Sequence, residues 1–160
     1  MIHLSDTVPA MTTATHSLHQ RMSAGALAPA VYKAMAAFDR SIELDPQLRE
    51  LVKIRASQIN GCAYCLDLHT RDARAAGEDE RRLATLAGWR ESPFFSDRER
   101  AALALTDAVT RLGEHGVTDE VWGEAATNFD EPELAQLLWA IVAINAWNRM
   151  GVATRLLPEQ

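Results

Sequence analysis

The chain is organised around the stretch Glu50-Leu-Val-Lys-Ile-Arg-Ala-Ser-Gln-Ile-Asn-Gly-Cys-Ala-Tyr-Cys-Leu-Asp-Leu-His69. It holds both cysteines of the protein, Cys62 and Cys65, in a Cys-x-x-Cys motif, and His69 follows four residues later. On a helix that opens near Cys62, the helical period places Cys65 one turn on and His69 one turn further, all on one face. Only a thiolate attacks a peroxide or a disulfide, and an imidazole can take the thiol proton, so this face indicates redox chemistry.

Length and cysteine content set the general class. A chain of 160 residues fits one domain that buries roughly 70% of its unfolded surface without cross-links. Two cysteines in a single motif do not make a secreted disulfide scaffold, and they favour a reducing compartment. Residues 1–10 include Asp6 and Pro9 and have neither a basic nor an apolar region of a signal peptide. We therefore expect a cytoplasmic protein.

Charge and hydropathy argue against two classes of partner. The net charge is −6 and there is no basic cluster, which argues against nucleic acid, because phosphates require a positive surface. The most apolar run, residues 134–147, spans 14 residues and contains Gln136 and Asn145. It is shorter than the ~20 residues that cross a bilayer, so we expect a buried helix and no membrane partner.

The apolar periodicity predicts one all-α domain of six to eight helices, over residues 26–160, preceded by a low-order arm or short helix over residues 1–25. Val31, Met35, Phe38 and Ile42 recur at intervals of four, three and four and predict a first amphipathic helix. Asp45-Pro46 predicts the start of a second helix, with an apolar face at Leu48, Leu51, Val52 and Ile59, which ends at Asn60-Gly61.

Further helices are predicted over about 62–76, 79–87 and 96–112, from 118, and from 130 through 152. Ser96 with Glu99 predicts a capping box. The predicted inner positions of these helices include Leu112, Trp122 and Val152. Asn145, Trp147 and Asn148 are interpreted as structural, because amides in an apolar helix usually bond across a contact.

Three segments resemble the AhpD-like alkylhydroperoxidases of the carboxymuconolactone decarboxylase superfamily. They are the run from Lys53 to His69 quoted above, Ala87-Gly-Trp-Arg-Glu-Ser-Pro-Phe-Phe95 and Ala143-Ile-Asn-Ala-Trp-Asn-Arg149. The likeness covers roughly residues 28–155. It implies an all-helical fold that assembles into trimers or hexamers. Apolar residues of the loop 89–95, together with Trp139 and Trp147, also predict a homotrimer or homohexamer, because they add exposed apolar surface.

The resemblance also implies roles for the site residues. Cys65 attacks the peroxide and becomes a sulfenic acid, Cys62 resolves it to a disulfide, and Glu50 and His69 relay the proton. The helix dipole instead favours Cys62 as the thiolate. We predict attack by Cys65, because His69 lies about 10 Å along the axis from Cys62. The best-known members carry a second histidine where this chain has Tyr64.

The predicted function is a thiol-dependent peroxidase or disulfide reductase that acts on a hydroperoxide or a partner disulfide. We expect no bound cofactor or metal, since a closed zinc site needs four ligands and no second ligand pair follows. The resemblance implies an outside reductant, either a lipoyl-bearing dehydrogenase subunit or another thiol carrier, and a peroxiredoxin as client. Two alternatives stay open: a lyase of the carboxymuconolactone decarboxylase kind, and a helical binding or assembly module with a vestigial site. The two cysteines could also be a metal half-site or incidental buried residues.

Overall fold

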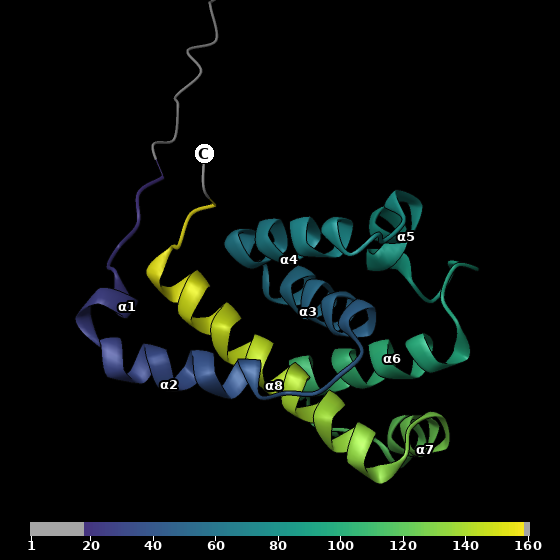
Figure 1. Cartoon of the computed structure of the whole chain (residues 1–160). Helices are drawn as coiled ribbons and strands as arrows, with labels where there is room; N and C mark the ends of the chain where they lie inside the picture. Colours follow the sequence, from purple (N-terminus) through teal and green to yellow (C-terminus); the bar gives the residue numbers. More distant parts are fainter. Residues whose placement is uncertain (1–17, 159–160) are drawn as a thin grey trace, which may run out of the picture.

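The computed structural model describes residues 18–158, which form α-helices and one 3-10 turn and no β-strand (Figure 1). This confirms the predicted all-α fold. The elements are α1 (Ala24–Leu27), α2 (Pro29–Arg40), α3 (Pro46–Asn60), α4 (Ala63–Ala75), α5 (Glu80–Thr85), the 3-10 turn η1 (Leu86–Gly88), α6 (Asp97–Arg111), α7 (Asp119–Asn128) and α8 (Glu131–Thr154).

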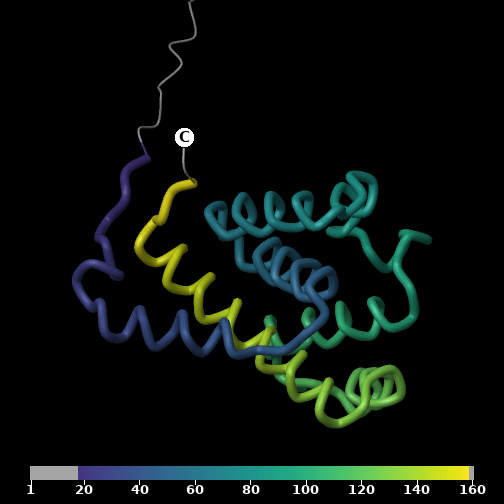
Figure 2. Tube along the Cα trace, in the orientation of Figure 1, coloured from purple at the N-terminus to yellow at the C-terminus, as the bar shows by residue number. Residues whose placement is uncertain are grey.

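Helix α3 lies at the centre, with α4, α6 and α8 packed around it (Figure 2). Its ends are those that the sequence predicts. Asp45 caps the first turn by accepting the backbone N–H of Leu48 at 2.9 Å, and Pro46 follows at the first helical position. Gly61 ends the helix at φ 68°, a left-handed conformation that glycine adopts without strain. The chain reverses there, so α4 returns alongside α3.

Helix α8 has 24 residues and crosses the molecule diagonally, in contact with α2, α3, α4, α6 and α7 (Figure 1). Asp130 caps it by accepting the backbone N–H of Glu133 at 2.8 Å. Most of the run 134–147 is buried or half-buried, as predicted, whereas Ala135, Trp139 and Val142 are exposed. Within residues 18–158, no helix combines the length and the apolarity that crossing a bilayer requires.

Two apolar cores lie on either side of α3. One joins α3 to α6, α7 and α8, and the other joins α3 to α4, α5, η1 and α6. The second core includes Trp89 and Phe95 from the loop that precedes α6, both nearly inaccessible to solvent. Most of the apolar surface of this loop is therefore buried within the chain, contrary to the expectation that it would contribute to assembly.

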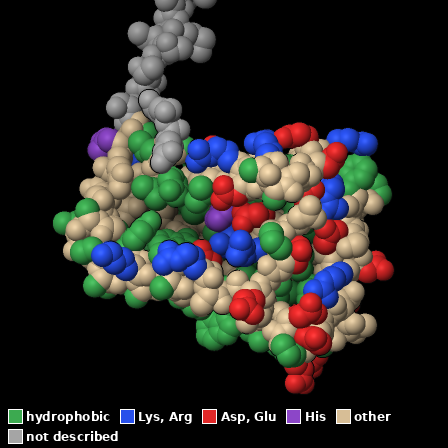
Figure 3. Space-filling model, in the orientation of Figure 1, with side chains coloured by type: hydrophobic (Ala, Val, Ile, Leu, Met, Phe, Trp, Pro, Cys, Tyr) green, Lys and Arg blue, Asp and Glu red, His purple; other side chains and the backbone are tan. Residues whose placement is uncertain are grey.

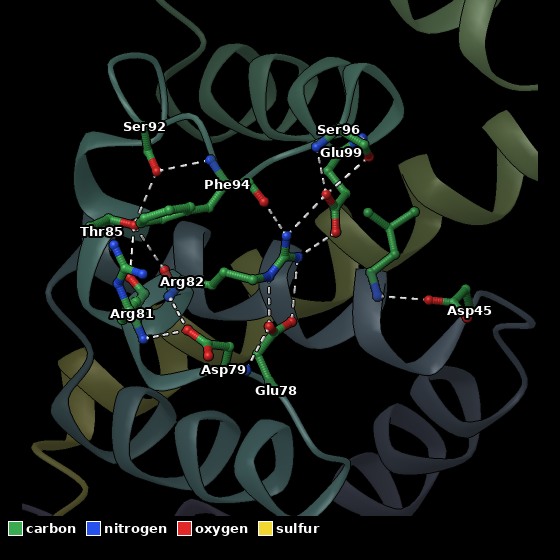
Figure 4. A network of polar contacts seen from close by, with 11 residues as sticks. Asp45, Glu78, Asp79, Arg81, Arg82, Thr85, Ser92, Phe94, Ser96 and Glu99 are labelled. Atoms are coloured by element: carbon green, nitrogen blue, oxygen red, sulfur yellow. Dashed lines mark hydrogen bonds and ion pairs between the residues drawn. The ribbon is translucent and has the colours of Figure 1, made fainter.

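Arginine side chains fix this loop to its neighbours (Figure 4). Arg82 of α5 forms ion pairs with Glu78 and Glu99 and donates to the carbonyl oxygen of Phe94. Ser96 and Glu99 form the predicted capping box at the start of α6. The loop from α5 to α6 is thus held by charged groups as well as by apolar packing.

A second charged cluster joins α3 to α6, and we name it the Asp107 cluster. Arg55 of α3 donates to both oxygens of Asp107, at 2.6 and 3.0 Å, and to the carbonyl oxygen of Ala87 at 3.2 Å. Arg90 lies 2.6 Å and Arg111 lies 3.4 Å from the same carboxylate. Burial alone would raise the pKa of Asp107, but the hydrogen bonds from Arg55 and Arg90 outweigh it and hold the pKa below its usual range.

Several predicted inner positions are exposed. Helix α2 lies at the edge and has no buried residue, and the buried Ile42 lies beyond its end at Arg40. Leu112 also lies beyond its helix, where the chain turns at φ 20°. The prediction was wrong for four residues with these exposed fractions: Val31 70%, Leu112 63%, Val152 47% and Trp122 43%.

The N-terminal part is described from Leu18 onward. The boundary predicted at residues 25–26 falls inside the short helix α1. Arg21 fixes the preceding segment to the end of α8, because its backbone N–H donates to the carbonyl oxygen of Thr154 at 2.8 Å and its guanidinium to that of Ala153 at 3.0 Å. The rest of the predicted arm, residues 1–17, lies outside the described residues.

Candidate active site

The two cysteines lie at the start of α4, under α8. Cys62 is the N-cap residue, and its sulfur accepts the backbone N–H of Cys65 at 3.4 Å. Both cysteines are free thiols, 2% and 4% exposed, and their side chains are hydrogen-bonded to each other. The turn at Gly61 creates this arrangement, because it brings the first turn of α4 back against α3 and α8.

The two thiols differ strongly in acidity. The hydrogen bond from the Cys65 thiol, the Cys65 backbone N–H, Asn148 and the charge on His69 together outweigh burial and lower the pKa of Cys62 to about 6. The same hydrogen bond and burial raise the pKa of Cys65. The pair therefore loses its first proton as a unit, and the resulting thiolate is centred on Cys62. The dipole at the N-terminus of α4 also favours a thiolate on Cys62.

Glu50 and His69, which lie 19 residues apart in sequence, meet across α3 and α4. His69 Nδ1 lies 2.8 Å from Glu50 Oε2, and both side chains are buried. A carboxylate at this distance holds the Nδ1–H tautomer and leaves Nε2 as the nitrogen for proton exchange. The structure thus brings together all four residues that the sequence selected, whereas their catalytic roles remain predictions.

A cavity of about 570 Å³ opens beside this corner. Cys65 and His69 line it, and Cys62 does not. Figure 3 shows a hollow on this face bordered mainly by hydrophobic side chains. Within the described residues, Asp39 is its only acidic lining residue and no lysine or arginine lines it. Its larger apolar lining residues include Val31, Tyr32, Met35, Leu68, Trp147 and Met150.

Two residues of α8 belong to this site that the sequence did not predict. Asn148 is 0% exposed and lies against both sulfurs, although it was interpreted as structural. Gly151 lets α8 approach the thiols, because a Cβ atom there would lie 2.9 Å from the Cys62 sulfur and 3.8 Å from the Cys65 sulfur. A signal existed in the sequence, since Asn145, Asn148 and Gly151 recur every three residues along α8.

One group of side chains within residues 18–158 could hold a cation. Donor atoms of Glu50, His69 and Asp72 all lie within 4.8 Å of one another. Carboxylate and imidazole ligands suit a hard or borderline divalent cation better than a soft cation, which prefers thiolates. Neither thiol belongs to this group. A metal ion would compete for the Glu50 carboxylate that now holds His69. The expectation that no metal is needed remains a prediction.

Comparison with known proteins agrees with this architecture. Residues 29–108 match the Carboxymuconolactone decarboxylase family. The uncharacterised protein YdfG of Bacillus subtilis (strain 168) is 39% identical over 139 residues, which cover 85% of this chain and 95% of YdfG.

Two solved structures are similar as well. The first is an Agrobacterium tumefaciens protein of unknown function, described as a candidate antioxidant defence protein AhpD. It has a TM-score of 0.85 and 35% identity, over 89% of this chain and 99% of its own. The second is the AhpD core of an uncharacterised peroxidase-related protein from Ralstonia eutropha JMP134. It shares the fold, with a TM-score of 0.74 and 19% identity, over 85% of this chain and 74% of its own. The chain belongs to the carboxymuconolactone decarboxylase family, as an AhpD-like member.

Proposed function

We propose that this protein is a thiol-dependent peroxidase that cycles Cys62 and Cys65 between dithiol and disulfide. The observation that carries the proposal is the coupled thiol pair, of which one sulfur faces an apolar cavity beside His69, itself held by Glu50. A lowered thiol pKa, a base and a substrate space are the parts that thiol-based peroxide reduction needs.

The sulfur that faces the cavity is not the more acidic one. A proton transfer between the two thiols accounts for this difference. Cys65 lines the cavity, so a peroxide meets Cys65 first. The Cys62 thiolate accepts the hydrogen bond of the Cys65 thiol and is therefore placed to take its proton. Cys62 thus serves first as the base for Cys65 and then as the resolving thiol. Attack by Cys65, as the sequence predicted, stays part of this proposal.

The reaction balances with the groups present. As the proton of Cys65 moves to Cys62, the Cys65 sulfur bonds to the terminal oxygen of the hydroperoxide and the O–O bond breaks. A proton from solvent, relayed through Nε2 of His69, reaches the leaving alkoxide, which gives an alcohol and a Cys65 sulfenic acid. The Cys62 thiol then condenses with the sulfenic acid to form a disulfide and release water. An external dithiol returns two electrons and two protons.

The cavity favours a hydroperoxide over the substrate of a decarboxylase. A carboxymuconolactone carries a carboxylate, which usually requires an arginine, a lysine or another strong donor group. In the described part of the chain the cavity offers Asp39 instead and no cationic lysine or arginine. Decarboxylation also has no use for a dithiol. The lyase alternative is therefore the weaker one for this chain.

The remaining partners follow from the same proposal. We propose that a lipoyl-bearing subunit or another thiol carrier in the cytoplasm supplies the electrons, with a peroxiredoxin as a further client. We also propose a homotrimer or homohexamer, supported by exposed apolar side chains on α2 and α8, among them Val31, Trp139 and Met150. Light scattering should give three or six times the chain mass of 17.7 kDa at micromolar concentration, and a monomer mass would contradict this part.

Turnover with serine variants tests the proposal. The parent protein should consume an organic hydroperoxide such as cumene hydroperoxide with dithiothreitol as donor. The Cys65→Ser variant should lose this activity. The Cys62→Ser variant should still accumulate a sulfenic acid on Cys65 that dimedone traps, but more slowly than the parent reacts, because the Cys62 base is also lost. Rapid sulfenic acid formation on Cys62 in the Cys65→Ser variant would reverse the assignment. No reaction of either thiol in the parent would favour a non-catalytic helical module.

A further inference from the structure

We propose that Asn148 is a catalytic residue whose side-chain amide donates a hydrogen bond to the Cys62 thiolate and holds it ready to accept the proton of Cys65. The inference rests on the proposed redox function for its purpose, but its geometry and its test are independent of peroxide reduction. It assigns a chemical role to a buried amide of α8 that the sequence pattern alone indicates to be structural.

The orientation of the Asn148 amide is fixed by its neighbours. Its Oδ1 accepts a hydrogen bond from Asn60 Nδ2 at 2.9 Å, and its Nδ2 donates to Ser57 Oγ at 2.9 Å. Ser57 in turn donates its hydroxyl proton to the carbonyl oxygen of Lys53 at 2.7 Å, so Ser57 Oγ can only accept from Asn148. A flipped amide would lose both bonds. The NH₂ group of Asn148 therefore faces Ser57 and not Asn60.

One N–H of this NH₂ group remains after the bond to Ser57. The Asn148 side chain lies beside the sulfurs of both Cys62 and Cys65, and it lowers the pKa of both thiols. An N–H donor stabilises a thiolate more than it stabilises a neutral thiol or a disulfide sulfur. The amide thus favours the charge state in which Cys62 can act as a base.

Gly151 makes this contact feasible. It lies three residues after Asn148 on α8 and presents no side chain toward Cys62, although a Cβ atom there would lie 2.9 Å from the Cys62 sulfur. Because real Cβ atoms do not approach so closely, any side chain at this position would displace the sulfur. The sulfur therefore sits directly against the face of α8 that carries Asn148.

Asn145 provides a matched control within the same network. It lies one turn before Asn148 on α8, is also buried, and also accepts from Asn60 Nδ2 at 2.9 Å. Its own Nδ2 donates to Thr110 Oγ1 and to the carbonyl oxygen of Ile141, both at 2.9 Å, and not to a sulfur. The two asparagines thus differ in the one contact on which the proposal depends.

The test measures thiol acidity in the reduced full-length protein without peroxide. The rate of alkylation by iodoacetamide is followed against pH, with the modified cysteine identified by mass spectrometry, in the parent, Asn148→Leu and Asn145→Leu. In the parent, the midpoint should lie near pH 6. A hydrogen bond to a charged group is worth about 1 to 2 pH units, so Asn148→Leu should raise the midpoint by that amount. Asn145→Leu should leave the midpoint in place.

A smaller change keeps the test decisive if Asn148→Leu does not fold. Ser57→Ala removes the hydroxyl that holds the amide and should raise the midpoint by less, in the same direction. An unchanged midpoint in Asn148→Leu, or in Ser57→Ala if the former does not fold, would overturn the proposal, as would an equal shift in Asn145→Leu. If the midpoints move as expected but the parent does not reduce hydroperoxide, the peroxidase proposal fails and the role of Asn148 stands.

Discussion

Two buried polar clusters lie against helix α3, and they use different chemistry. The Asp107 cluster compensates one carboxylate with guanidinium groups, among them Arg55 of α3. The thiol cluster places Cys62 and Cys65 beside the neutral amide of Asn148, which Ser57 holds in place. Arg55 and Ser57 are two residues apart, which on a helix points them about 200° apart. One helix thus supports a fixed set of charges on one side and a titratable set on the other.

The comparison of the two clusters shows that a buried polar group can contribute either to stability or to reactivity. A buried charge with opposite charges around it stays ionised, so the Asp107 cluster holds α3 to α6 in one state at neutral pH. A buried thiol pair among neutral donors can gain or lose a proton at modest cost, and its charge state can follow a reaction. The clusters should therefore respond to mutation in opposite ways.

The largest effect is expected from the proton relay of the thiol cluster. Glu50→Gln and His69→Ala should each slow peroxide reduction by about 10²- to 10⁴-fold at pH 7, the usual value of general acid-base assistance. Folding should survive, since neither change removes apolar packing. Stopped-flow consumption of hydroperoxide measures the rate. His115→Ala, an exposed histidine far along the chain, is the control. Parent rates in both variants would make Glu50 and His69 structural.

The Asp107 cluster should show the reverse behaviour. Asp107→Ala leaves the buried Arg55 without its carboxylate and should lower the free energy of unfolding by about 3 to 5 kcal/mol. The alkylation midpoint of the thiols should not change. Urea unfolding followed by circular dichroism measures the loss. Glu133→Gln, which removes an exposed ion pair with Arg98, should cost much less. Equal losses in the two variants would contradict the division between the clusters.

The smallest effect is the pH dependence of stability from Cys62. Its pKa is about 6 in the folded protein against an ordinary value of 9.0. A group whose pKa is lowered on folding contributes stability above its unfolded pKa and loses that contribution as the pH falls through the folded value. The free energy of unfolding of the parent should therefore rise between pH 6 and pH 8 relative to Cys62→Ser. Parallel curves from urea titrations would show that the thiol is not acidic.

Much of this fold could be predicted because local signals agree with it. Asp45-Pro46, Gly61 and the Ser96–Glu99 capping box mark helix ends by backbone chemistry that does not depend on distant parts of the chain. The grouping of Cys62, Cys65 and His69 follows from helical spacing. Glu50 is different, since its place beside His69 depends on how α3 packs on α4, and the family resemblance supplied it.

The rest could not be predicted because it depends on which surfaces meet. Val31 and Val152 show helical apolar spacing, but their side chains stay exposed in the described chain. Trp89 shows the reverse, because an apolar loop residue became part of the core. Asn148 and Gly151 join the site only because α8 crosses the start of α4, a contact 86 to 89 residues away in sequence from Cys62. No local pattern fixes a crossing of that kind.

The most direct measurement is the product of one peroxide equivalent with the reduced protein. Addition of one equivalent of hydroperoxide should remove both titratable thiols, lower the intact mass by two hydrogens and yield a single Cys62–Cys65 cross-link in the peptide map. Dithiothreitol should restore both thiols. Two thiols that remain titratable after excess hydroperoxide, or a stable oxygen adduct on one cysteine with no cross-link, would contradict the dithiol-disulfide cycle.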